Sequence, residues 1–240
     1  MTAAQLVRVQ ATRVAQVRRA TVSTVQRSWL ALDAYRDADI AAWVRTVSPV
    51  VQAGQIRTAA LTDAYLAAYR AEVTGELSRP VGVPTEVATG ARGVPTAEVY
   101  ARMGPEVWSR LANGLSIDQA VQAGLARALK VAATDLQLAK THAADYVLRA
   151  DDTVTSYRRV INGETCSLCI SAADRTYYRG DLLPIHPGCD CSVQPVYGEP
   201  APTVNPSTEP ADDRGDLEVN HHGELGPVLT VSGQHFEGPR

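Results

Sequence analysis

Two short motifs, Cys166-Ser-Leu-Cys169 and His186-Pro-Gly-Cys189-Asp-Cys191, hold every cysteine of the 240-residue chain and are separated by sixteen residues. Thiolate sulfur and imidazole nitrogen are ligands that zinc prefers in proteins. A Cys-x-x-Cys turn places two sulfurs on one side of a loop, and His186 and Cys189 repeat that three-residue step. The motifs therefore predict a metal site. A tetrahedral ion takes four ligands, and the candidates number five: Cys166, Cys169, His186, Cys189 and Cys191.

Two disulfides are the alternative, because four cysteines is an even number. Three observations favour metal. All cysteines fall within residues 166–191, His186 stands at a ligand position, and the chain begins Met1-Thr-Ala-Ala-Gln without the apolar segment of a secretory signal. We therefore expect a structural Zn²⁺ in a protein that folds in a reducing cytoplasm. The spacing resembles that of a zinc ribbon, in which two tight turns converge on one ion.

Short β-rich segments surround the motifs, and long helical patterns precede them. The brief strands are expected at Val154, Ser156-Tyr157, Val160-Ile161, Tyr177-Tyr178 and Ser192-Val193-Gln194. Upstream, Ser116 and Gln119 match a capping box, and apolar residues then recur at helical spacing, which predicts a helix reaching Leu148.

The N-terminal part of the chain is also helical in pattern. Its first 48 residues contain neither Gly nor Pro, which is permissive for long helices. A second apolar pattern runs from Ile40 to Val51, and we expect Pro49 to kink or interrupt it because proline removes a backbone donor. A third pattern starts at Leu61 and ends near Gly75.

Together these patterns predict a mainly α-helical body with a small zinc-ribbon-like β unit and an extended C-terminal tail, α+β overall. The expected segments are an N-terminal helical segment (1–75), a Pro/Gly-rich connector (76–95), a second helical part (96–152), the cysteine/histidine metal-binding β unit (153–197) and an acidic, Pro-rich extended tail (198–240).

Three stretches carry a resemblance to a known family: Tyr157-Arg-Arg-Val-Ile-Asn-Gly-Glu-Thr-Cys166-x-x-Cys169, then Tyr178-x-Gly180, then Leu183-Pro-Ile-His-Pro-Gly-Cys-Asp-Cys-Ser-Val193. In this order they resemble the signature of the phage Mu F-like (MuF-like) minor head proteins. The resemblance is densest over residues 100–197, and it makes 96–152 the helical part of a MuF-like domain. Asp190 stands where a basic residue is expected most often. The acidic tail has no counterpart in the resemblance.

The resemblance implies a virion structural protein of a tailed bacteriophage, present in few copies. Such a minor capsid protein is made in the host cytoplasm and lies in the phage head near the portal. The resemblance implies a role in head morphogenesis, in DNA ejection or in both, so the implied partners are the portal protein, the major capsid protein or both.

Other function classes fit the residues less well. We expect no enzyme and predict no catalytic residue. His222-Gly-Glu224 matches the H-x-E element of zinc deaminases, but it follows Cys166-x-x-Cys169, whereas in deaminases it comes first. A zinc-dependent hydrolase or deaminase is therefore the last alternative. No apolar run approaches the length of a membrane span, so we expect no membrane contact.

A nucleic-acid-binding zinc-ribbon protein is the first alternative. The net charge is −3, and acids balance arginines around the cysteine motifs, so no phosphate-binding surface is indicated there. Residues 1–32, however, contain no acid. This segment predicts either contact with packaged DNA, a solvated face, or pairing with an acidic portal surface, through Arg8, Arg13, Arg18, Arg19 and Arg27.

Overall fold

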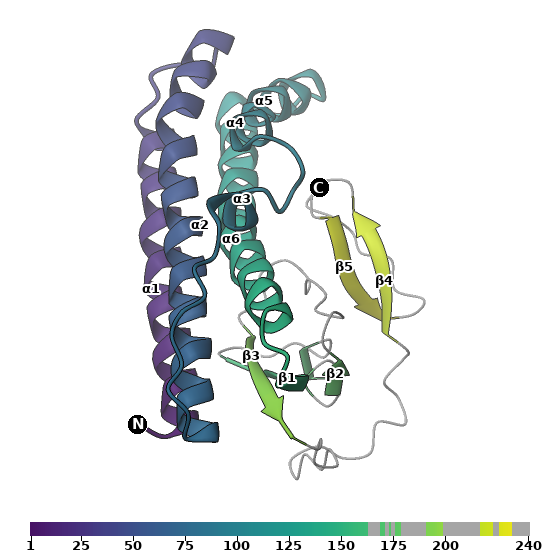
Figure 1. Ribbon diagram of the computed structural model, residues 1–240. Coiled ribbons are helices and arrows are strands. Elements are labelled where there is room, and N and C mark those ends of the chain that lie inside the picture. Colours follow the sequence, from purple (N-terminus) through teal and green to yellow (C-terminus); the bar gives the residue numbers. More distant parts are fainter. Residues whose placement is uncertain are drawn as a thin grey trace.

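The computed structural model describes residues 1–162, 169–170, 173, 176–178, 191–198, 217–222 and 226–231. Three long helices lie side by side, and a small antiparallel sheet packs at one end of them (Figure 1). The helices are α1 (Ala3–Leu30), α2 (Asp37–Thr74), α3 (Thr85–Thr89), α4 (Thr96–Ala101), α5 (Met103–Ala112) and α6 (Ile117–Arg149). The strands are β1 (Val154–Val160), β2 (Thr176–Tyr178), β3 (Ser192–Tyr197), β4 (Leu217–His222) and β5 (Gly226–Val231).

The capping box predicted at the start of α6 is confirmed. The backbone N–H of Gln119 donates to Ser116 Oγ at 3.3 Å, and the backbone N–H of Ser116 donates to Gln119 Oε1 at 3.0 Å. The helix then ends at Arg149, one residue beyond the predicted Leu148. An equivalent box, formed by Thr2 and Gln5, begins α1. Both long helices therefore start with their first backbone donors satisfied.

Pro49 does not interrupt the second helix. One helix, α2, spans all 38 residues from Asp37 to Thr74, so the second and third patterns expected from the sequence are a single element. Pro49 is exposed, and so is Arg45, whose carbonyl loses its helical donor and lies where water can bond to it. Val47 and Val51, on either side, are buried, and their packing holds the helix together across the missing bond.

A tryptophan core fills the end of the bundle near the α1–α2 turn. Its central members are Trp29, Trp43, Tyr100, Met103 and Val107, and all are at most 2% exposed. The ring centroids of Trp29 and Trp43 are 4.9 Å apart in an edge-on arrangement, and those of Trp43 and Tyr100 are 5.9 Å apart. This core is built from apolar contact between α1, α2, α4, α5 and α6.

The predicted connector carries its own anchors to the bundle. Both carboxylate oxygens of the buried Asp63 accept backbone N–H groups, from Val81 at 2.9 Å and from Gly82 at 2.8 Å. Further on, Arg92 forms a buried ion pair with Asp135 of α6, and Tyr100 Oη donates to the same carboxylate at 3.0 Å. Burial raises the pKa of the Asp135 carboxyl, and Arg92 and Tyr100 act against that shift. These bonds fix the path of the connector between α2 and α6.

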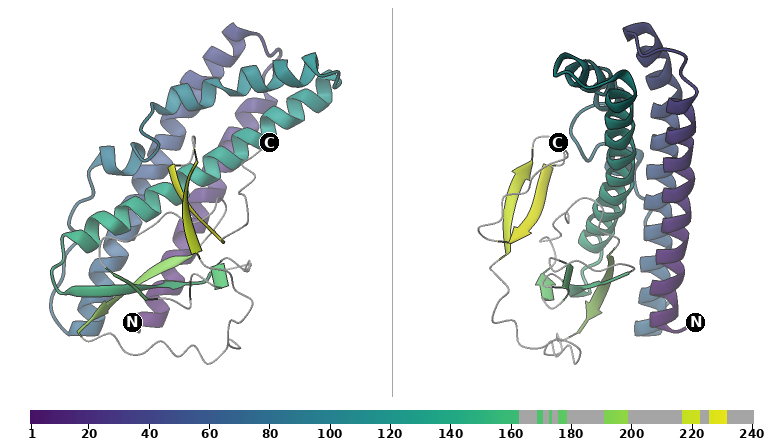
Figure 2. Two further views of the ribbon diagram at one scale, coloured as in Figure 1. Left: turned by 90° about the vertical axis from the view of Figure 1, so that its right-hand side faces the viewer. Right: turned by 180° about the vertical axis from the view of Figure 1, so that it is seen from behind.

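The predicted strands form a three-stranded antiparallel sheet in the order β2-β1-β3. Tyr157 lies opposite Tyr177 in β2 and Pro195 in β3, and the two tyrosine rings stack 5.1 Å apart. The sheet packs on the ends of α1, α2 and α6 opposite the tryptophan core, as two further views show (Figure 2). The small sheet is thus continuous with the body through a second core.

Two segments of the predicted tail form paired strands. Strands β4 and β5 pair as an antiparallel hairpin, with Leu217 opposite Val231 and His222 opposite Gly226. The rest of the predicted tail beyond Gly198 lies outside the described residues. Within the described residues, no helix is both long and apolar enough to cross a membrane.

Candidate metal centre

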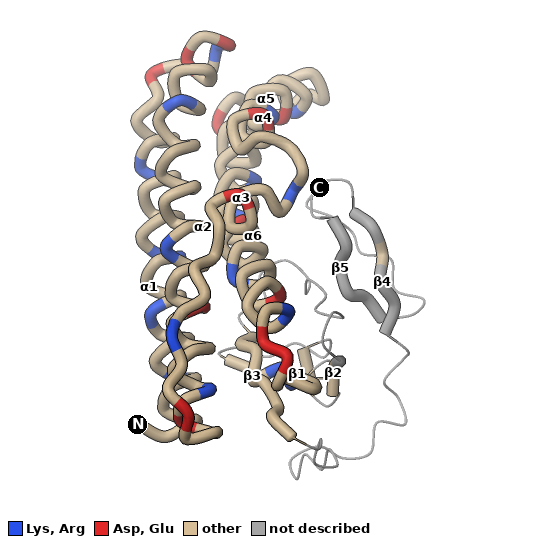
Figure 3. The backbone as a smooth tube through the Cα atoms, in the orientation of Figure 1, with Lys and Arg blue, Asp and Glu red and all other residues tan. Residues whose placement is uncertain are grey.

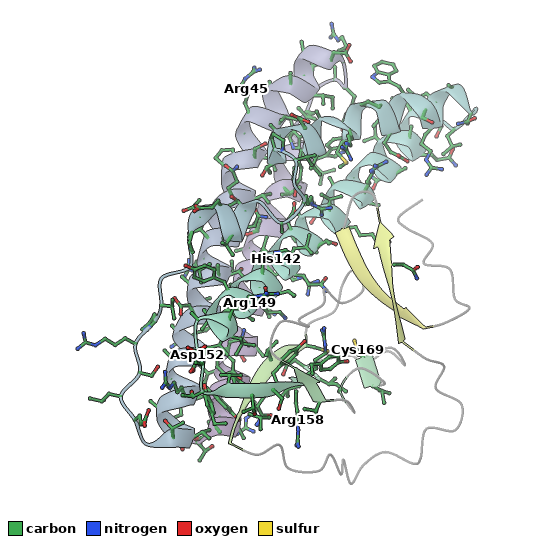
Figure 4. All side chains as sticks on the ribbon, turned by 45° about the vertical axis from the view of Figure 1, so that its right-hand side comes forward. Arg45, His142, Arg149, Asp152, Arg158 and Cys169 are labelled. Atoms are coloured by element: carbon green, nitrogen blue, oxygen red, sulfur yellow. The ribbon has the colours of Figure 1, made fainter. Side chains whose placement is uncertain are left out.

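The structure brings together one cysteine from each motif. Cys169, which is labelled in Figure 4, and Cys191 are both 4% exposed and belong to one buried cluster, against which Ile161 packs. The other three predicted ligands, Cys166, His186 and Cys189, lie outside the described residues. Among the residues that the structure does describe, no three His, Cys, Asp or Glu side chains gather closely enough to hold a metal.

Strand pairing explains why the two motifs meet. Val160 at the end of β1 lies opposite Ser192 at the start of β3. The first motif follows β1 by a few residues, and Cys191 directly precedes β3. Because the strands are antiparallel, the chain leaves the sheet and returns to it at the same place. A site built from both motifs therefore needs no further domain to assemble it.

A chain of short hydrogen bonds fixes β3 on α1 beside Cys191. Ser192 Oγ donates to Gln10 Oε1 at 2.6 Å and accepts from Asn162 Nδ2 at 2.6 Å. Ser192 is 1% exposed and Gln10 is 4% exposed, so water does not compete for these groups. The residue after the second motif is thereby held against the first helix of the chain.

Two tyrosines of α2 hold the next turn of the same strand. Tyr65 Oη donates to the carbonyl of Val193 at 2.8 Å, and Gln194 Nε2 donates to Tyr69 Oη at 2.6 Å. Burial raises the pKa of both tyrosines, so their hydroxyls stay protonated and can donate. We call this set the tyrosine junction: Gln10, Tyr65, Tyr69, Ser192, Val193 and Gln194.

Two buried cations lie beside the cysteine cluster. Lys140 of α6 is 6% exposed and Arg159 of β1 is 4% exposed, and both line a small void together with Cys191. The guanidinium of Arg159 also lies 5.0 Å from the ring centroid of Tyr177. Lys140 was not among the predicted site residues. Its position could have indicated that it is buried, because it falls on the i, i+4 stripe that runs from Leu136 to Leu148.

The donor set fits a structural metal better than a catalytic one. A thiol from each motif, buried against an aliphatic side chain, suits a closed zinc site with protein ligands only. A catalytic zinc site keeps one position open to water, and the described part of this cluster offers buried sulfurs. The two buried cysteines, one from each motif, could supply two of the four ligands of such a zinc site.

The arginines of α1 form a separate surface. Arg8, Arg13, Arg19 and Arg27 are exposed, and Arg18 is half-buried. Arg57 of α2 lines a groove between the two helices together with Arg13. Basic residues recur along this α1–α2 hairpin, and acids are confined to its ends and to the buried Asp63 (Figure 3). Four of the five predicted arginines are thus accessible on the surface of α1.

No protein-family model, curated protein or solved structure matches this chain.

Proposed function

We propose that this protein is a MuF-like minor head protein of a tailed bacteriophage, located in the phage head near the portal vertex, with a structural zinc site. Its role is structural and not enzymatic, and it acts in head assembly, in DNA delivery or in both. The observation that carries the zinc site is the shared burial of Cys169 and Cys191, one from each motif. The phage assignment rests on the resemblance of Tyr157–Val193 to the family signature.

The zinc ion would supply what the small β unit lacks. Three short strands alone bury too little apolar surface for stability, and zinc binding free energy becomes folding free energy in such units. The tyrosine junction holds one end of the unit on the helices. Zinc would tie together the two motifs beside this anchor, so that the whole unit presents one surface to the portal protein or the major capsid protein.

Metal content tests the zinc site. The wild-type protein, purified without chelator, is expected to hold about one zinc per chain with thiols that are not crosslinked. Cys166→Ser and His186→Gln are expected to lose zinc and to make 153–197 sensitive to protease. His142→Gln is the matched control, because His142 lies on α6 outside the motifs. Zinc-free wild-type protein whose cysteines are all in disulfides would reject the site.

Co-sedimentation tests the location. When the protein is co-expressed with the portal and capsid proteins of its phage, it is expected to sediment with procapsids or portal rings. Cys166→Ser should reduce that association, and His142→Gln should leave it unchanged. Absence of the wild-type protein from both kinds of particle would contradict the proposal.

Contact with packaged DNA is a second role, favoured by the acid-free arginine face of α1. The test is binding of double-stranded DNA at rising salt, because each phosphate contact contributes to the salt dependence. Replacing Arg8, Arg13, Arg19 and Arg27 with Gln should weaken binding and flatten its salt dependence. The control replaces Arg110 and Arg149, which pair with Glu106 and Asp145 on their own helices. Equal loss in both variants would argue for unspecific attraction.

A further inference from the structure

The position of Lys140 and Arg159 assigns them a role that the cysteine motifs do not reveal. We propose that these two buried cations balance the negative charge of the zinc–thiolate centre and thereby couple its metal affinity to the helical body. The inference rests on the proposed zinc site and goes beyond it, because it names residues outside both motifs as determinants of metal binding.

Charge counting explains why such a site needs cations. Zinc with three thiolates and one imidazole carries a net charge of minus one, and zinc with four thiolates carries minus two. Removing that charge from water is costly unless opposite charges lie close by. Cys169 and Cys191 are both buried in an apolar cluster, so solvent gives little compensation.

The void beside Cys191 supplies charge of the right sign. Its described lining residues include two cations, Lys140 and Arg159, and no acid. The two cations come from different elements, α6 and β1, and both are at least nine-tenths buried. Ile161, two residues after Arg159 and just beyond the end of β1, packs against the cysteine cluster.

Neighbouring residues hold the two cations in place. Lys140 lies in a stretch of α6, residues 134–141, in which every residue is buried. The ring of Tyr177 supports the guanidinium of Arg159. Ordered side chains around metal ligands tune affinity, and changing them typically costs about 10- to 100-fold. We therefore expect the cations to act on the metal through fixed geometry.

Zinc affinity, measured by competition with a chromophoric chelator, tests the proposal. Lys140→Met removes the charge at similar length, and we expect about 10- to 100-fold weaker zinc binding. Lys140→Arg keeps the charge and should stay within about threefold of wild type. Lys130→Met is the matched control, because the only other lysine of the chain is exposed on the same helix, and it should bind zinc as wild type does.

The outcomes separate the two proposals. A wild-type protein that binds no zinc overturns both. Zinc binding that is equally tight in wild type and Lys140→Met overturns the role of the cation and leaves the zinc site standing. Equal weakening by Lys140→Met and Lys140→Arg also overturns it, because shape and not charge would then matter. If Lys140→Met does not fold, judged by circular dichroism, Arg159→Met against Arg159→Lys makes the same comparison.

Discussion

Both ends of the helical bundle have an apolar core, but the end that carries the sheet adds a set of hydrogen bonds between helix and strand. At the α1–α2 turn, the tryptophan core consists of large side chains that pack from five helices with few polar groups. At the other end, the tyrosine junction joins helix to strand through directional hydrogen bonds. Apolar packing tolerates small shifts, whereas a hydrogen bond requires a defined distance and angle. The junction therefore determines where the cysteine unit lies, and the core determines whether the bundle forms.

The largest effect expected from this comparison comes from truncating the core. Trp29→Ala removes a fully buried ring that contacts Trp43, and we expect about 3–5 kcal/mol loss in the free energy of unfolding. The measurement is urea denaturation. Leu30→Ala is the control, since Leu30 is exposed, and should change stability by less than about 0.5 kcal/mol. Similar losses in both variants would contradict the role of the tryptophan core in stability.

A change at the junction should cost less and act locally. Ser192→Ala leaves the buried Gln10 without its donor and Asn162 without its acceptor, so we expect a loss of about 1–3 kcal/mol. Hydrogen exchange should show faster opening of β3 with little change in α4 and α5. Thr155→Val, which removes an exposed hydroxyl of β1 and keeps the branched shape, is the control. Uniform acceleration across the chain would mean that the two ends do not differ.

Gly124 sharpens the comparison by testing how tightly the core is packed. A Cβ there would lie 2.8 Å from both Trp29 and Val107 side-chain atoms. On an exposed helix Gly→Ala is stabilising by up to about 1 kcal/mol, but overpacking costs about 1–3 kcal/mol, so we expect a net loss of about 1 kcal/mol. The double variant with Val107→Ala should show less than the sum of the two losses, because space opens for the methyl group. If the losses in the free energy of unfolding, measured by urea denaturation, simply add up, the close contact between positions 124 and 107 would be contradicted.

The smallest expected effect is a pH dependence of stability that arises from His142 of α6. Burial lowers the pKa of His142, and Asp145 acts weakly against that shift. The unfolded chain therefore takes up a proton at higher pH than the folded chain does. The stabilising contribution is complete above the unfolded pKa of 6.5 and is lost as pH falls below it. The urea midpoint should drop between about pH 7.5 and about pH 5.5, and His142→Gln should reduce that drop; an unchanged drop would count against the role of His142.

Sequence patterns were sufficient for elements whose signal is local. The Ser116–Gln119 capping box and the apolar repeat after it predicted α6 almost to its last residue. The strands beside the cysteine motifs were also predicted, because alternating side chains and turn residues lie close together in the sequence. Pro49 does not interrupt α2, because its local cost is offset by the packing of Val47 and Val51, which no local pattern reveals.

The candidate site shows the same division. The motifs indicated which residues could bind metal, and antiparallel pairing of β1 and β3 brings Cys169 and Cys191 together. The apolar stripe of α6 could have indicated that Lys140 is buried, but not that it lines a void with Arg159 and Cys191, because those residues follow far along the chain. Such contacts between distant segments are seen in the folded chain and in no local pattern.

The unbroken α2 has a consequence for assembly. At 1.5 Å per residue, its 38 residues span roughly 57 Å. The α1–α2 turn and the strand that follows Cys191 lie near its two ends, so one continuous helix sets the spacing between them. A single partner that binds both ends must span this length. Two partners that bind one end each would be separated by about the same distance.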